Sequence, residues 1–242
     1  MTAGTASTHS TTAPNDPSQT GDTTLPYQPR PLTRGERNRR LTHVFYSVRN
    51  HRIVTVTEAI NAAAAMMFEF DPSLEVYVER PRRLQLSPRQ QIDIAFWTRT
   101  REGQERFYVT VPEAGTIGST SGTVSVRDPS VLAEVAQRHE MTLHILTEAQ
   151  LRSQSAWLKT CNELMLHLWE YTRQPARSVI RHHIEGRLAQ ASRISLSGLV
   201  PTLDYTHTAI KAVVAAMIHD GSLRLVEYTP GMIDAVLEVG GA

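Results

Sequence analysis

Apolar and polar residues alternate in short runs through the N-terminal half of the chain, and a period of two is typical of half-buried strands. The first run, Val44, Tyr46 and Val48, is followed by a polar turn at residues 50–51 and a second run from Ile53, which predicts a hairpin. Further strand-like runs lie at residues 74–78, 83–86, 91–97, 106–111 and 141–146. Residues 114–121 are rich in glycine and serine and are predicted to form a loop.

Two helices are predicted among these strands. Thr57 is the expected N-cap of an alanine-rich helix from Ala59 to about residue 70, and Asp71 and Pro72 end it. A second helix runs from residue 129 to about residue 139. This order of elements predicts an α/β domain in which helices flank a small mixed sheet.

After residue 149 the pattern becomes mainly helical, with one helix that ends before Pro175. Shorter helices are predicted at residues 176–188, near 195–203 and at 206–219, and strand-like runs follow at 223–228 and 235–239. The helix at 206–219 carries an amphipathic stripe made of Ile210, Val213, Val214, Met217 and Ile218. Three helices followed by a hairpin are the order of a winged-helix domain.

The N-terminal segment differs in composition from the rest. Residues 1–26 contain almost no large apolar side chain, so nothing offsets the entropy of ordering and a disordered tail is expected. Residues 27–40 form an arginine-rich arm. Its candidate DNA contacts are Arg34, Arg37, Arg39 and Arg40. A guanidinium offers phosphate oxygens a fixed fork of donors, so such an arm is suited to a nucleic-acid backbone.

Two other interpretations of the arm remain open. The 25 basic residues of the chain include only two lysines, Lys159 and Lys211, so arginine replaces lysine throughout. The arm arginines are also able to pair with Glu69 and Glu75 at the surface of the sheet. The net charge is only +1, and any nucleic-acid contact must therefore be local.

The single cysteine, Cys161, excludes an internal disulfide and a paired-cysteine zinc site. No apolar run reaches the roughly 20 residues that a membrane-spanning helix needs. The N-terminus lacks the pattern of a signal peptide. We therefore expect a cytoplasmic protein with no membrane partner.

Four motifs in the N-terminal half point to a known family. They are Phe45-Tyr46-Ser47-Val48-Arg49-Asn50-His51-Arg52-Ile53-Val54, Glu69-Phe70-Asp71-Pro72, Glu79-Arg80-Pro81 and Ile92-Asp93-Ile94. This series resembles the TnsA family, the endonuclease subunits of heteromeric transposases, over about residues 41–239. The resemblance implies a restriction-endonuclease-like PD-(D/E)XK domain over residues 41–174 and a winged-helix domain over residues 175–242.

The resemblance also implies where a nuclease site would lie. Such a site binds Mg²⁺ through a helix-borne acid, a strand Asp and an acid or amide two residues before a lysine. The helix position, eight residues before Glu69, is Asn61, and the strand Asp is Asp93. The Glu/Gln-x-Lys positions fall on Val109 and Val111. One ligand of three is present and the lysine is missing, so no metal cofactor is expected unless the nuclease is active.

A rebuilt site is the alternative to a degenerate one. Glu58 lies one helical turn before Asn61, and Glu113 follows the expected catalytic strand. Either acid would have to join Asp93 in holding Mg²⁺. The opposing interpretation makes Asp93 a structural carboxylate.

The C-terminal domain has its own candidate contacts. His207 and Lys211 lie opposite the apolar stripe of the helix at residues 206–219, on the face that enters the major groove in a DNA-binding winged helix. Protein docking by this face is equally open, because the resemblance implies that the C-terminal domain docks a partner ATPase.

Three functions follow from this pattern. The first is a catalytically degenerate TnsA-like subunit that acts in transposition by binding DNA, a DDE-type transposase subunit and an AAA+ ATPase regulator. The second is an active, metal-dependent endonuclease that cuts at transposon ends with a rebuilt site. The third is a winged-helix regulator that uses the nuclease-like domain as an interaction platform. The missing lysine and the missing ligands favour the first.

Overall fold

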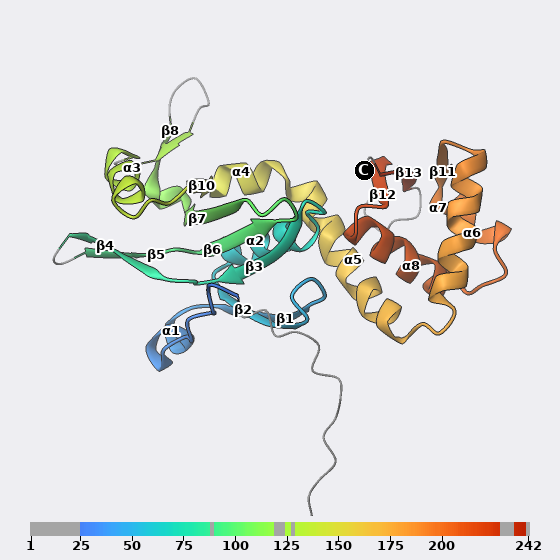
Figure 1. Ribbon diagram of the computed structural model, residues 1–242, viewed down its shortest axis with the longest axis horizontal. Coiled ribbons are helices and arrows are strands. Elements are labelled where there is room, and N and C mark those ends of the chain that lie inside the picture. Colours follow the sequence, from blue (N-terminus) through green and yellow to red (C-terminus); the bar gives the residue numbers. More distant parts are fainter. Residues whose placement is uncertain (1–24, 88–89, 119–123, 127–128, 228–234, 241–242) are drawn as a thin grey trace, which may run out of the picture.

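The computed structural model describes residues 25–87, 90–118, 124–126, 129–227 and 235–240. At its centre is a mixed four-stranded sheet in the order β10-β7-β6-β3 (Figure 1). The strands are β3 (Leu74–Glu79), β6 (Phe96–Thr100), β7 (Glu105–Val111) and β10 (Leu143–Thr147). Strand β10 runs parallel to β7, and the other pairs are antiparallel. The predicted α/β class with a mixed sheet is confirmed.

Helix α2 (Ala59–Glu69) covers one face of this sheet. Its Ala64 and Phe68 are buried in one cluster with Tyr77 and Phe96 of the sheet, because the small alanine side chains let the helix lie close to the strands. The predicted N-cap is wrong. Thr57 still belongs to strand β2, and the helix is preceded by Glu58, whose side chain makes no capping hydrogen bond.

The opposite face of the sheet is closed by α3 (Pro129–Arg138) and by the start of the arm. Val135 of α3 is buried with Trp97 and Phe107. The ring of Tyr27 packs on the same two residues, with centroid distances of 5.2 Å to Trp97 and 5.3 Å to Phe107. Leu25, which falls within the predicted tail, also packs on this cluster. Residues 1–24 of that predicted tail lie outside the described residues.

Three two-stranded ribbons surround the sheet. They are β1 (Thr42–Ser47) with β2 (Arg52–Thr57), β4 (Arg83–Ser87) with β5 (Gln90–Asp93), and β8 (Thr116–Gly118) with β9 (Val124–Val126). The first ribbon is the predicted hairpin. The second extends away from the sheet in Figure 1.

Two segments differ from their predicted form. The single strand predicted at residues 91–97 is two strands, because β5 ends at Asp93 and the Ala95 N–H then donates to the Tyr108 carbonyl in the central sheet. The loop predicted at residues 114–121 contains part of a short helix, η1 (Glu113–Gly115), and strand β8. A run of three residues is too short to show a period in the sequence.

The C-terminal part is mainly helical, as predicted. Its helices are α4 (Glu148–Ser153), α5 (Ser155–Arg173), α6 (Arg177–Gln190), α7 (Leu196–Leu199), η2 (Val200–Thr202) and α8 (His207–His219). Strands β11 (Arg193–Ser195), β12 (Leu223–Glu227) and β13 (Val236–Val239) form an antiparallel sheet in the order β11-β13-β12.

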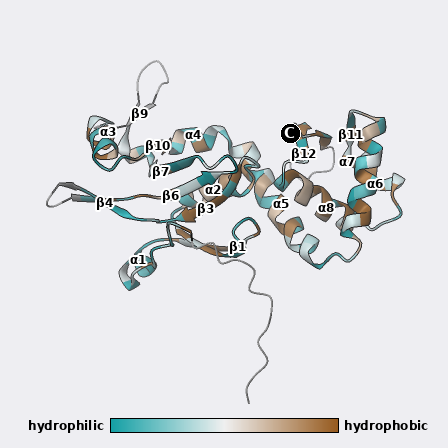
Figure 2. Ribbon diagram, in the orientation of Figure 1, coloured by the Kyte–Doolittle hydropathy of each residue, from teal (hydrophilic) through white to brown (hydrophobic). Residues whose placement is uncertain are grey.

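Helix α8 is buried on more than its predicted stripe. Ala209, Ala212, Ala215 and Ala216 are buried as well. Figure 2 shows hydrophobic residues along most of this helix. Helix α5 packs against it, and Leu164 and Leu168 share one core with α8. This core also includes residues of α6, so it continues across residue 174, where the sequence predicts a domain boundary.

The buried carboxylate of Glu69 joins the two parts of the chain. It accepts hydrogen bonds from the Ser47 hydroxyl (2.6 Å), the Arg49 backbone N–H (2.9 Å) and the Tyr77 hydroxyl (2.8 Å). On α8, His219 Nε2 lies 3.1 Å from Glu69 Oε1. The pairing of Glu69 with the arm arginines, one of the open interpretations, is therefore not formed.

The arm is ordered as a short helix, α1 (Arg34–Arg39), at the edge of the sheet domain. A capping box starts it: the Thr33 hydroxyl accepts from the Glu36 N–H (3.2 Å), and the Glu36 carboxylate accepts from the Thr33 N–H (2.8 Å). Leu32, just before the cap, is buried. The arm is thus anchored to the fold at its start.

Candidate functional site

A polar pocket lies at the start of α2, between the arm and the strands β5 and β7. Its cavity volume is about 280 Å³. The lining includes four of the residues singled out from the sequence, Arg40, Glu58, Asn61 and Asp93, together with Thr110. The structure therefore brings the expected helix position and the expected strand Asp into one pocket.

Both polar atoms of the Asn61 amide are engaged by the protein. Its Nδ2 donates to the Thr57 carbonyl (2.9 Å), and its Oδ1 accepts a hydrogen bond from the Thr110 hydroxyl (2.8 Å). These bonds tie the first turn of α2 to strand β7. At the position where the resemblance expects a carboxylate, the chain therefore has a neutral side chain with a structural role.

Asp93 is held by two arginines from different segments. Its Oδ1 accepts from Arg30 of the arm (3.0 Å), and its two oxygens accept from Arg83 Nε (2.6 Å) and NH2 (3.1 Å). Arg83 is the residue directly opposite Asp93 in the β4–β5 ribbon. A carboxylate paired with two guanidinium groups is already neutralised, and this supports the structural interpretation of Asp93.

Val109 and Val111, the expected Glu/Gln-x-Lys positions, do not line the pocket. Both valines are buried in the cluster on the opposite face of the sheet from α2. Successive side chains of a strand point to opposite faces, so Tyr108 and Thr110 are the β7 residues that face α2. The expected strand pair therefore does not meet Asn61 and Asp93.

The two acids of the rebuilt site lie apart. Glu58 is at the pocket, where its carboxylate is 3.3 Å from the Arg40 guanidinium. Glu113 is outside the pocket lining, and its carboxylate pairs with Arg152 of α4 at 3.2 Å. Glu113 therefore does not join Asp93. Glu58 has a backbone φ of 70°, in the left-handed region that L-residues rarely adopt, so its position is held by the surrounding structure.

Two further acids of the pocket are not among the candidate site residues from the sequence. Glu79 is buried at the end of β3, and its two oxygens accept from Arg52 at 2.9 and 2.6 Å. Glu36 belongs to the capping box of α1, and the signal that would have found it is the Thr-x-x-Glu spacing from Thr33. Hydrogen bonds from the Thr33 backbone and hydroxyl, with the nearby Arg30 charge, lower the pKa of Glu36 to about 2.

The residues present do not fit the metal site that the resemblance implies. Mg²⁺ is bound through one or two carboxylates in near-ideal octahedral geometry. In this pocket each carboxylate faces a guanidinium group instead, in the pairs Glu36–Arg30, Glu58–Arg40, Glu79–Arg52 and Asp93–Arg83. In the ranges that the structure describes, no three or more His, Cys, Asp or Glu side chains are grouped to hold a metal ion.

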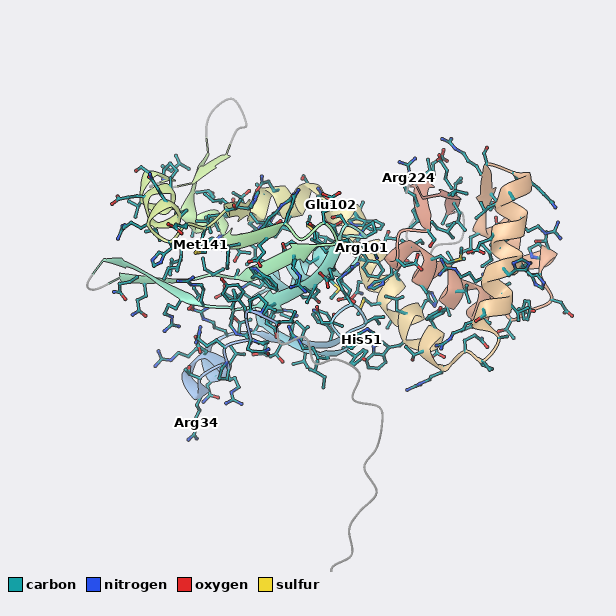
Figure 3. All side chains as sticks on the ribbon, in the orientation of Figure 1. Arg34, His51, Arg101, Glu102, Met141 and Arg224 are labelled. Carbon is teal, nitrogen blue, oxygen red and sulfur yellow. The ribbon has the colours of Figure 1, made fainter. Side chains whose placement is uncertain are left out.

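The four arginines of the arm differ in their surroundings. Arg34, Arg37 and Arg39 are exposed and have no ion-pair partner within the described part of the chain. Figure 3 shows Arg34 projecting from α1 away from the rest of the molecule. Arg40 is the exception, because it pairs with Glu58. Glu75 pairs with Arg99 of the neighbouring strand at 2.8 Å and not with the arm.

The predicted groove-facing surface of α8 is partly exposed. His207 is exposed at the first turn, but Lys211 is only partly exposed, and the alanines around it are buried. The small side chains allow α5 to pack closely against this helix. Burial, together with the charges of Lys211 and His207, lowers the pKa of His167 on α5. His167 of α5 therefore lies close to Lys211 and His207.

No protein-family model and no curated protein matches this chain. None of the helices in the described ranges has both the length and the apolar character to cross a bilayer.

Proposed function

We propose that this chain is a catalytically degenerate, TnsA-like subunit that binds DNA and partner transposition proteins without cutting the DNA. The observation that carries the proposal is the state of the pocket at Asn61 and Asp93. Its carboxylates are engaged by arginines, and the residue that β7 contributes to it is Thr110, which is neither an acid nor a lysine. Hydrolysis of a phosphodiester in this fold needs carboxylates that are free to hold a metal ion, and the carboxylates of this pocket are paired with arginines.

The arrangement of elements supports a restriction-endonuclease-like domain followed by a winged helix. A mixed sheet with α2 on one face and α3 on the other suits the first. The order α6, β11, α7, α8, β12, β13, with β13 central in its sheet, suits the second. Because α5 covers α8, protein docking is better supported for this second domain than reading of DNA bases.

DNA binding is assigned to α1. Its three unpaired arginines lie on one short helix that is anchored by Leu32 and by the capping box. Contacts from arginine to phosphate oxygens give affinity without base recognition. Such contacts depend on the local charge of α1, so they are compatible with an overall net charge of only +1.

A cleavage assay tests the catalytic part of the proposal. The full chain is incubated with supercoiled plasmid and Mg²⁺ or Mn²⁺, beside an Asp93→Ala variant purified in the same way. We expect the plasmid to stay intact with both proteins. Metal-dependent nicking that disappears in Asp93→Ala would contradict the proposal and support the rebuilt endonuclease.

The genomic neighbourhood tests the transposition part. Genes for a DDE-type transposase and an AAA+ ATPase are expected next to the gene for this chain. If both are missing, the winged-helix regulator becomes the better interpretation.

A further inference from the structure

The β1–β2 ribbon carries apolar side chains that the core does not use. In the register of the hairpin, Val44 lies opposite Thr55 and Tyr46 lies opposite Ile53, so these residues share the outer face of the ribbon. Val44 is 62% exposed and Ile53 is 63% exposed, whereas Val54 on the inner face is buried. The outer face is therefore apolar and open to solvent.

Helix α5 forms a second wall beside this ribbon. Trp169 of α5 is 50% exposed. Together with β1 it bounds a groove of about 450 Å³, lined by Val44, Phe45, Tyr46, Ile53, Trp169, Thr172 and Arg173. An exposed tryptophan beside exposed aliphatic side chains is typical of a binding surface.

The same groove runs along an unprotected strand edge. Within the described residues β1 pairs only with β2, so the N–H and C=O groups on its other side have no strand partner. Natural edge strands are usually protected by charges, by proline, by a bulge or by short length. Strand β1 has six residues, none of them charged or proline, and its register with β2 is regular. It is thus suited to accept an added strand.

The charge at the groove limits what can bind. Arg173, at the end of α5, is the one charged residue of the lining, and it has no acidic partner in the described part of the chain. A matching segment needs apolar side chains at alternate positions for Val44, Ile53 and Trp169. It also needs a carboxylate that reaches Arg173.

We infer that the free edge of β1 and the groove beside α5 bind an extended segment of a partner protein, with alternating apolar residues and one acidic residue. Backbone hydrogen bonds to β1 supply affinity, and the groove with Arg173 sets the sequence preference. The surface does not include the arginines of α1 or the pocket at Asp93. The inference therefore does not rest on the proposed function.

The test uses the full chain and a fluorescein-labelled, acetylated peptide, Thr-Val-Thr-Val-Thr-Val-Asp, with fluorescence anisotropy as the readout. We expect saturable binding that weakens at least tenfold in Trp169→Ala and in Val44→Lys. The matched control is Leu166→Ala, because Leu166 is also an exposed apolar residue of α5 but lies outside the groove lining. That variant is expected to bind like the wild type.

Three modified peptides test the mode of binding. The first peptide is N-methylated at the alternate residues whose N–H groups would face β1, and we expect it not to bind. The second is N-methylated at the other residues, and we expect it to bind like the unmodified peptide. Arg173→Glu weakens binding of the peptide that ends in Asp and strengthens binding of the same peptide ending in Lys. Circular dichroism of each variant shows whether it is folded.

Several results would overturn the inference. Equal binding by Trp169→Ala, or equal loss with both N-methylated peptides, would place the peptide elsewhere. Concentration-dependent dimerisation that Val44→Lys abolishes would assign the edge to a second copy of the chain. Peptide binding that appears only after deletion of residues 1–24 would assign it to the chain's own N-terminal segment. DNA affinity of the same variants is measured as well, because it tests the proposed role of α1 independently of peptide binding.

Discussion

Glu69 and His219 are 150 residues apart in the chain, yet their side chains meet at 3.1 Å between the sheet domain and α8. The Glu69 side chain is fully buried, and that of His219 is 12% exposed. Arg49 donates to the backbone carbonyl of both residues, at 2.8 Å and 3.3 Å. A polar cluster with this many specific partners defines how the two parts of the chain are joined.

Replacing Glu69 is expected to weaken the whole fold. Glu69→Ala leaves the hydrogen-bond donors of Ser47, Tyr77 and His219 without an acceptor, and the free energy of unfolding should fall by about 3–5 kcal/mol. Urea denaturation measures this loss. The control is Glu75→Gln, which removes an exposed ion pair and should cost less than about 1 kcal/mol. Equal effects from the two variants would show that the cluster does not contribute to stability.

The same cluster predicts that the free energy of unfolding depends on pH. Burial alone raises the pKa of Glu69, but hydrogen bonds from His219, Ser47 and Arg49 outweigh it and hold the pKa below its ordinary value of 4.5. A group whose pKa is lowered by folding stabilises the protein above the unfolded pKa, and this contribution is lost as pH falls through the folded pKa. The stability difference between wild type and Glu69→Gln should therefore narrow below about pH 4.5. A constant difference down to pH 2 would contradict the lowered pKa.

Lysine scanning of β7 tests which residues face the pocket. Val111 is buried in the core, so Val111→Lys places an ammonium group among apolar side chains and should cost about 4 kcal/mol in unfolding free energy. Thr110 borders the pocket, and Thr110→Lys loses one hydrogen bond to Asn61, at a cost of about 1 kcal/mol. Thermal and urea denaturation of the two variants provide the comparison. If Thr110→Lys is destabilised more than Val111→Lys, then Val111 and not Thr110 faces the pocket.

The α1 arginines are expected to carry the salt dependence of DNA binding. Changing Arg34, Arg37 and Arg39 together to Gln should weaken binding to a duplex and reduce the slope of log K against log salt by up to about 3 units. Anisotropy titrations over a range of NaCl concentrations measure the slope. A control variant with the same loss of charge changes Arg138, Arg193 and Arg224, which pair with Glu134 or Glu238. An equal effect in both variants would indicate a response to net charge alone.

The close packing of α8 is also open to test. Ala212 and Ala215 are fully buried, so replacing either with Leu overpacks the helix interface and should cost about 1–3 kcal/mol in unfolding free energy. Ala189 on α6 is exposed, and Ala189→Leu should change stability by less than about 0.5 kcal/mol. If Ala212→Leu and Ala215→Leu are tolerated without loss, α8 is less tightly covered and DNA-groove entry becomes possible again.

The candidate site shows where prediction from sequence stopped. The motif positions placed Asn61 and Asp93 in one pocket, which the structure brings together, but the strand pair was assigned to Val109 and Val111. The alternation of Phe107, Val109 and Val111 already marked these residues as a core face. A shift of one residue in a strand exchanges its two faces, so a motif position in a strand depends on a register that the motif spacing alone does not define.

The sequence alone determined the local elements of this protein. The β1–β2 hairpin, α2, α8 and the α/β order follow from periods of two and 3.6 residues and from the Asp71-Pro72 stop after α2, which depend only on neighbours a few positions apart. Only the tertiary structure decided which charges pair and which faces are covered. Arg30 and Asp93 are 63 residues apart, and Glu69 and His219 are 150 apart, so their pairing depends on how the chain folds back on itself. The burial of α8 under α5 has the same cause, because an alanine face gives no sign in sequence of the helix that will pack against it.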